Sequence, residues 1–178
     1  MMVGKAMYKN KIPDLFLSLF LCSMFFVNAT LHAQALTLLD KAQQEKINQK
    51  YSKANYYYFK ILSKQSNNEA AIYGLAHSFH CMNQNDRALQ EVNKLIAINL
   101  NNEKALELRA RINVQNQLWN NVLSDVSHII EINPANAMAY MYMDNAYTAL
   151  GNQKAADEAL KQYREIKALE KNINMDKL

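Results

Sequence analysis

The chain has 178 residues, of which half are hydrophobic and a fifth are charged, as in a globular protein of one domain. It holds only three Gly and two Pro, where average usage supplies roughly a dozen Gly and about nine Pro. This scarcity of turn residues favours an all-α fold. It excludes P-loop and dinucleotide-binding classes, because Gly4, Gly74 and Gly151 are too dispersed to form a loop that closely approaches a phosphate.

The net charge changes once the first segment of the chain is set apart. It is +4 for the whole chain. Residues 36–178 hold 17 basic and 15 acidic residues and carry +2, because Lys5, Lys9, Lys11 and Asp14 are left out. A charge this small, with the two signs interleaved, is typical of an ordinary solvated surface. We therefore predict no nucleic-acid partner.

Residues 1–35 have the organisation of a secretory signal peptide. Three lysines precede the apolar run Leu15–Val27, and a short polar stretch then ends in Ala33-Gln34-Ala35. The run has 13 residues, whereas a helix needs about 20 to span a bilayer. We expect cleavage after Ala35, with Ala29 and Ala33 as alternative sites, and an uncleaved anchor as the alternative fate of the segment.

The cysteines do not change this interpretation. Cys22 lies inside the apolar run, but Leu19-Phe20-Leu21 before it are too bulky for a lipoprotein signal. Cleavage leaves Cys81 as the only cysteine, so an intramolecular disulfide cannot form even in an oxidising compartment.

The rest of the chain repeats with a period of 34 residues. The segments 69–102, 103–136 and 137–170 align without gaps. Three places of the repeat show the agreement: the eighth (Ala76, Ala110, Asp144), the twentieth (Ala88, Val122, Ala156) and the twenty-fourth (Val92, Val126, Leu160). This pattern resembles the tetratricopeptide repeat, with Tyr140, Met143 and Tyr147 at its large positions and Pro134 at its terminal proline. Residues 35–68 continue the phase as a degenerate first repeat, and 171–178 form a short extension.

The helical periodicity supports two helices in each repeat. Ile72, Leu75, Ala76 and Phe79 stand at i, i+3, i+4 and i+7. The predicted helices, in chain order, cover residues 36–50, 53–65, 69–83, 86–98, 103–116, 119–132, 137–150 and 153 to about 172. The resemblance implies an all-α right-handed superhelix of antiparallel helix pairs, an α-solenoid.

Two features depart from the family pattern. Asp144 occupies a place that the family gives to Gly or Ala, so its carboxylate needs solvent or a partner. Only eight residues follow the last repeat, so we expect the helix from residue 153 to cap the stack with its own polar face.

The resemblance also implies a concave groove lined by the first helix of each repeat. The candidate partner-binding residues are Tyr73, His77, His80, Lys104, Glu107, Arg111, Met138, Met141 and Asn145. Their alternative role is ordinary groove surface, with Lys104 and Arg111 in solvated pairs with Glu103 and Glu107. Some family members clamp an acidic chaperone tail, but of the clamp positions only Lys104 matches, so we do not expect that activity.

We predict neither catalysis, a metal nor a cofactor. His77, His80 and Cys81 have a helical spacing on which metal ligands could converge, but no fourth ligand is evident. No nucleophile motif occurs, and His128 is predicted on a second helix away from the groove.

Two functional hypotheses follow. The first is a non-enzymatic scaffold, exported to the periplasm or cell envelope or secreted, that binds a peptide or partner protein in the groove. The alternative is a structural envelope protein that self-associates through an exposed end of the stack, without a dedicated groove. A membrane enters either hypothesis only through an uncleaved signal segment.

Overall fold

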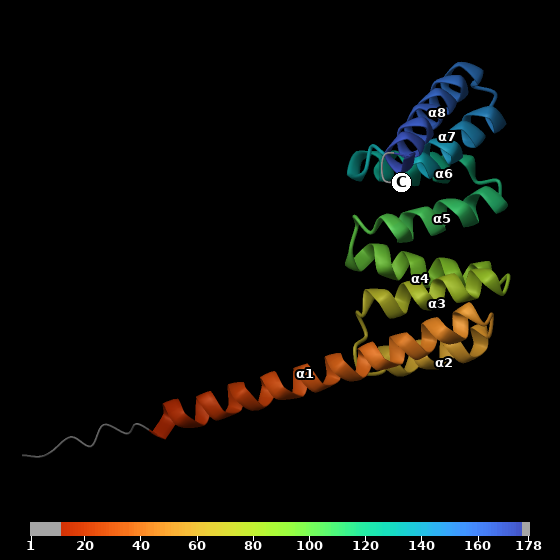
Figure 1. The fold of residues 1–178 in the computed structure, drawn as a ribbon. Coiled ribbons are helices and arrows are strands. Elements are labelled where there is room, and N and C mark those ends of the chain that lie inside the picture. Colours follow the sequence, from red (N-terminus) through yellow and green to blue (C-terminus); the bar gives the residue numbers. More distant parts are fainter. Residues whose placement is uncertain (1–11, 176–178) are drawn as a thin grey trace, which may run out of the picture.

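The computed structural model of the chain describes residues 12–175, which form eight helices and no strand. The helices are α1 (Ile12–Ile47), α2 (Tyr51–Leu62), α3 (Glu69–Cys81), α4 (Asn85–Ile98), α5 (Glu103–Gln115), α6 (Trp119–Ile132), α7 (Ala137–Ala149) and α8 (Gln153–Met175). Consecutive helices pair, and the pairs stack from α1 and α2 at the bottom of Figure 1 to α7 and α8 at the top. This arrangement confirms the predicted all-α solenoid.

The predicted helix boundaries hold except at the first helix. The ends of α2 to α8 agree with the expected ranges within about three residues. We expected a separate helix over 36–50, but α1 begins at Ile12, continues through the apolar run without a break and ends at Ile47. It ends early because the chain turns at Gln49, which has a φ of 57°.

The turns inside the four helix pairs share one backbone conformation. One residue in each turn has a positive φ, and these residues recur every 34 residues: Gln49, Asn83 and Gln117 at 57° and Gly151 at 76°. The next N–H then donates to a carbonyl five residues back, as from Leu118 to Asn113 at 2.9 Å, which closes the preceding helix. Side chains other than Gly hold this left-handed conformation at a cost of about 1–2 kcal/mol.

The connections between pairs share a second device, an asparagine that caps the next helix. The side-chain oxygens of Asn68, Asn102 and Asn136 accept from the N–H groups of Ala71, Ala105 and Ala139 at 3.0, 3.0 and 2.9 Å. This contact satisfies one of the free donors that every helix start leaves.

The amide nitrogens of two capping asparagines also tie one pair to the next. Asn102 donates to Glu69 at 2.9 Å, and Asn136 donates to Glu103 at 2.6 Å. Each glutamate is the first residue of the preceding pair and accepts a second bond, from Asn99 or Asn133. The asparagines at the start and at the end of each of these two connections therefore bind the same glutamate. A charged acceptor makes such hydrogen bonds stronger than neutral ones.

Small residues let the helices of a pair approach closely. Every residue at the eighth and twentieth places except Asp144 is fully buried: Ala42, Ala54, Ala76, Ala88, Ala110, Val122 and Ala156. Large side chains such as Ile72 and Leu95 fill the space between pairs, so nearest neighbours share one continuous core. Asp144 is half-buried and lies 3.5 Å from the hydroxyl of Thr148.

The third repeat carries a polar cluster that we did not predict. Where the second repeat places Leu75 and Phe79, the third places Arg109 and Asn113. Arg109 binds the buried Asp125 through two nitrogens, at 2.6 and 3.1 Å, and reaches Asn93 at 2.9 Å. The ion pair compensates the burial of the Asp125 carboxylate, whose side chain is only 3 % exposed.

The outer face of α8 ends the stack. Helices α4 and α6 present Leu89, Ile96, Leu123 and Ile130 to the pair that follows. The corresponding places of α8 hold Asp157 and Arg164, both exposed. A further pair would have to bury these charges, so the expected capping by a polar face agrees with the structure.

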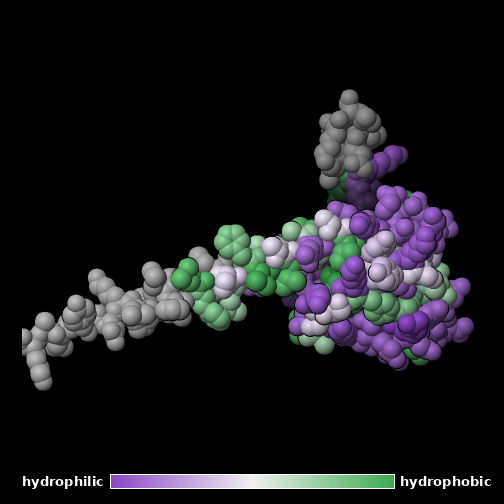
Figure 2. All heavy atoms as spheres, turned by 90° about the horizontal axis from the view of Figure 1, so that it is seen from below, coloured by the Kyte–Doolittle hydropathy of each residue, from purple (hydrophilic) through white to green (hydrophobic). Residues whose placement is uncertain are grey.

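The part of α1 before the first repeat projects from the stack (Figure 1), and from Leu19 onward the face seen in Figure 2 is mainly apolar. Exposed fractions reach 75 % at Phe25 and 71 % at Phe26, and Ala35 is the first residue buried in the core. Within the described residues, Leu19–Ile47 is the one helical stretch long and apolar enough to cross a membrane, a property that signal sequences share.

The shared turn conformation predicts that Gln117→Gly raises the free energy of unfolding by about 0.5–1 kcal/mol, because relief of the left-handed strain exceeds the gain in unfolded-chain entropy. Gly151→Ala should lower it by about 1 kcal/mol. Urea denaturation measures both. Gln115→Gly, in the last turn of α5, is the control and should destabilise; equal losses for Gln117→Gly and this control would contradict the strain argument.

The capping contacts predict that Asn136→Ala lowers the free energy of unfolding by about 2 kcal/mol, since it removes both the helix cap and the bond to Glu103. Asn120→Ala, an exposed residue of α6, should change it by less than about 0.5 kcal/mol. Thermal unfolding of the two variants gives the comparison. Similar free energies of unfolding for the two variants would show that the junction between helix pairs does not depend on the cap.

Candidate functional site

The concave side of the stack holds a pocket of about 490 Å³ between the first helices of three pairs. Leu39, Gln43 and Lys46 line it from α1, Ala70 and Tyr73 from α3, and Lys104 from α5. Tyr73 and Lys104 are two of the predicted groove residues. Tyr73 and Lys104 lie 31 residues apart in the sequence. The structure brings both of them to one pocket, together with residues of the first repeat.

The shape of this pocket depends on a glycine. A side-chain carbon added at Gly74 would lie 2.2 Å from the ring of Tyr58, which comes from α2 and is itself buried. Tyr58 can thus reach the pocket from behind α3 only because Gly74 has no side chain. The pocket wall combines carbon surface from Leu39 and the tyrosine rings with two lysines, Lys46 and Lys104, and two acidic residues, Asp40 and Glu69.

Arg111 anchors a second group of predicted residues on α5. Its guanidinium binds Glu107 at 2.8 Å, and its Nε donates to the hydroxyl of Tyr142 on α7 at 3.1 Å. The hydrogen bond to Tyr142 raises the pKa of Arg111. Tyr142 was not among the predicted residues: it stands beside Met141 in the sequence, and only the packing of α5 against α7 shows that it reaches Arg111.

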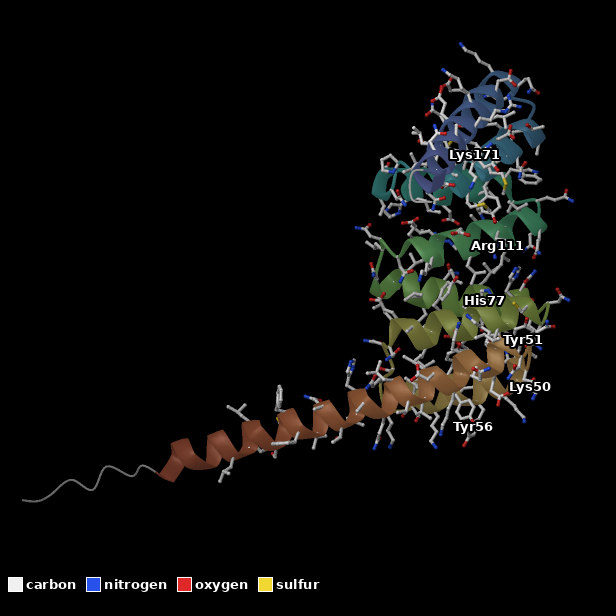
Figure 3. All side chains as sticks on the ribbon, viewed as in Figure 1. Lys50, Tyr51, Tyr56, His77, Arg111 and Lys171 are labelled. Carbon is white, nitrogen blue, oxygen red and sulfur yellow. The ribbon has the colours of Figure 1, made fainter. Side chains whose placement is uncertain are left out.

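Tyr73 and His77 connect these two groups. Their rings lie 6.1 Å apart and are both half-buried. Burial raises the pKa of Tyr73, and the Glu107 carboxylate raises it further. Burial lowers the pKa of His77, as do Lys46, Arg111 and His80. Charges from α1, α3 and α5 therefore act on one side chain. Figure 3 shows the positions of His77 on α3 and Arg111 on α5.

The remaining predicted residues lie apart from the pocket. His80 contacts Asn85, the first residue of α4, at 3.0 Å. Met138 lines a separate hollow with Tyr163 and Lys167 at the far end of the stack. Met141 is half-buried and packs on the core, and Asn145 is exposed. The structure thus joins Tyr73, His77, Lys104, Glu107 and Arg111 but separates the methionine end of the groove from them.

The histidine and cysteine of α3 form a pair rather than a wider cluster. The thiol of Cys81 lies 3.5 Å from Nδ1 of His77. Among the residues that the structure describes, no three His, Cys, Asp or Glu side chains are placed to hold a metal ion. His128 lies on α6, where its ring contacts Asn101 at 3.1 Å.

The fold is shared with proteins of known structure, whereas no family model and no curated protein matches the sequence. The chain is 16 % identical to MamA from Desulfovibrio magneticus, with a TM-score of 0.70 over 75 % of each chain. It is 22 % identical to the first TPR domain of RPAP3, bound to the HSP90 peptide SRMEEVD, with a TM-score of 0.63 over 66 % of this chain and 94 % of that one.

A third similar structure is a tetratricopeptide repeat protein from Parabacteroides merdae. It has 19 % identity and a TM-score of 0.66 over 72 % of this chain and 50 % of that chain. Together these similarities show that the chain has the tetratricopeptide-repeat fold.

The environment of His77 predicts a pH-dependent loss of stability. Its pKa is lowered in the fold from the ordinary 6.5, so the unfolded chain takes up the proton first as the pH falls below about 6.5. The wild type should therefore lose stability relative to His77→Asn over that range, and keep a constant difference above it. Urea titrations at several pH values test this; a relative gain at low pH would contradict the burial argument.

Proposed function

We propose that the protein is a non-enzymatic scaffold whose concave pocket binds an extended segment of a partner protein. The observation that carries this proposal is the pocket of about 490 Å³, where two lysines face tyrosine rings and aliphatic carbon across three helix pairs. Such a mixed wall suits a peptide that presents a carboxylate beside apolar side chains.

The polar groups of the pocket are unequally engaged. Glu69 on its wall already accepts bonds from Asn99 and Asn102, and Glu107 is paired with Arg111. Lys46 and Lys104 belong to none of the ion pairs among the described residues. Asp40 on the same wall also belongs to none of these ion pairs. Two ammonium groups and one carboxylate are thus left for a ligand, an excess of one positive charge that favours an acidic segment over a basic one.

A similar fold binds such a ligand in the RPAP3 domain, whose HSP90 peptide SRMEEVD is acidic. The present chain differs at the clamp positions, where it has Gly74 and Leu108. We therefore propose a partner with its own sequence, recognised by aromatic contact at Tyr73 as well as by charge.

We further propose that the protein acts in the periplasm or cell envelope after export. The lysines before the apolar run and the exposed apolar residues of α1 support this proposal. Mass spectrometry of the protein isolated from cell fractions tests it, with a mature chain beginning at Leu36 as the expected result. A full-length chain in the cytoplasm would contradict export.

The groove proposal predicts that decapeptides selected by phage display on the wild-type protein are rich in Asp and Glu. Their affinity should fall about tenfold or more in Lys46→Gln/Lys104→Gln, because both cationic partners of the carboxylates are removed. Fluorescence anisotropy gives the dissociation constants. Lys154→Gln/Lys161→Gln, which removes the same charge on α8, should leave them unchanged; equal weakening in both would mean that the groove does not bind the peptide.

A further inference from the structure

The charge of the stack is concentrated in its first helix pair. Residues 36–68 contain six lysines and two acidic residues, Asp40 and Glu45, a net charge of +4. Residues 69–178 hold 11 basic and 13 acidic residues, a net charge of −2. The small charge of the exported chain as a whole therefore conceals a strongly basic end, next to which the apolar part of α1 leaves the stack (Figure 1).

The outer face of α2 combines lysines with exposed aromatic rings. Lys53, Tyr56 and Lys60 follow one another at i, i+3 and i+7 and thus share the side opposite the buried Tyr58. Tyr56 is 61 % exposed, and Phe59 beside it is 47 % exposed. Figure 3 shows Tyr56 at the end of the stack, pointing away from it. We call Lys53, Tyr56, Phe59 and Lys60 the α2 face.

Neither the charge nor the aromatic character of this face is required by the repeat. The other second helices have polar residues at the places of Tyr56 and Phe59: Gln90 and Asn93, Ser124 and Ser127, Glu158 and Lys161. Phe59 has some packing role, since its ring lies 6.5 Å from that of Phe79. The ring of Tyr56 contacts the ring of its sequence neighbour Tyr57, and no other ring among the described residues. Neither lysine belongs to an ion pair of the described residues.

The chemistry of the α2 face fits a lipid surface better than a nucleic acid or a structured protein site. Lysines with tyrosine and phenylalanine are typical of membrane–water interfaces, where the ammonium groups meet phosphates and the rings enter the headgroup layer. Residues 36–68 contain no Arg, the residue that suits bidentate phosphate recognition in nucleic acids. The face is the convex surface of one helix, which matches a flat and fluid partner.

From these observations we propose that the α2 face docks the stack on an anionic phospholipid surface. The apolar segment of α1 joins the same helix pair, so this end of the stack lies next to the bilayer for as long as the segment remains on the chain. The opposite end, with Asp157 and Arg164 exposed, stays away from the membrane. This inference is independent of peptide binding in the concave pocket, which involves other residues.

The test is co-sedimentation of the full protein, as recovered after export, with vesicles of phosphatidylglycerol and phosphatidylcholine in equal parts and with pure phosphatidylcholine vesicles. We expect binding to the anionic vesicles that weakens as salt is raised. A lysine near such a surface contributes about fivefold in affinity, so Lys53→Gln/Lys60→Gln should lower the partition coefficient at least tenfold. Tyr56→Ser should lower it a few-fold at unchanged charge.

The matched control is Lys154→Gln/Lys161→Gln, the same charge change at the far end of the stack. Because every variant carries the same N-terminus, an apolar segment retained on the chain cannot account for a difference between them. The proposal would be overturned if the partition coefficient fell equally in the two double variants. It would also be overturned if the protein bound pure phosphatidylcholine vesicles as strongly as the anionic ones. Binding of polyglutamate or single-stranded DNA to the α2 face without binding to vesicles would overturn it too. Peptide affinity in the groove, measured on the same variants, should not change.

Discussion

At two of the three junctions of the stack, a bond between a capping asparagine and the glutamate that begins the preceding helix pair fixes how one pair lies on the next; at the first junction the amide of Asn68 donates to Gln65 instead. Asn102 and Asn136 each end one pair and start the next, so a single side chain fixes both the first turn of a helix and its distance from the helix two positions earlier. Because the connection is only a few residues long, the direction of each new helix follows from this contact. The row of first helices on the concave side is a consequence.

Most residues that line the pocket come from the first helices α1, α3 and α5. Each first helix contributes residues of a single face, so Lys46, Tyr73 and Lys104 line one pocket. The same rule allows the opposite side to carry different chemistry. The α2 face lies outside the groove, at places where the other second helices have polar residues.

The sequence predicted the fold because period, helix periodicity and buried small residues agree with one another. Ala76 and Ala88 could be placed in the core from spacing alone, and seven helices follow the expected ranges closely. Sequence patterns did not predict contacts between side chains of different helices. The contact from Arg111 to Tyr142 depends on how closely α5 approaches α7, and the role of Gly74 depends on the ring of Tyr58 behind it.

The continuous α1 and the polar cluster show two further limits. The apolar segment and the first helix of the first repeat form one continuous helix, so the helix start expected at residue 36 does not occur. Arg109 and Asn113 stand where the pattern expects large apolar residues; their burial became understandable only with Asp125, a partner 16 residues away from Arg109 in the sequence. The fate of the leader and the identity of a partner lie in chemistry that neither spacing nor packing encodes.

The polar outer face of α8 has a consequence for how such proteins can change in length. Asp157 and Arg164 make the surface that ends the stack charged, where the corresponding surfaces of α4 and α6 are apolar. A duplicated 34-residue unit inserted before α7 would meet apolar surfaces on both sides, whereas the same unit added after α8 would meet charge. Growth of this architecture is thus directed to its interior, and the concave surface can lengthen by whole units while the terminal pair is retained.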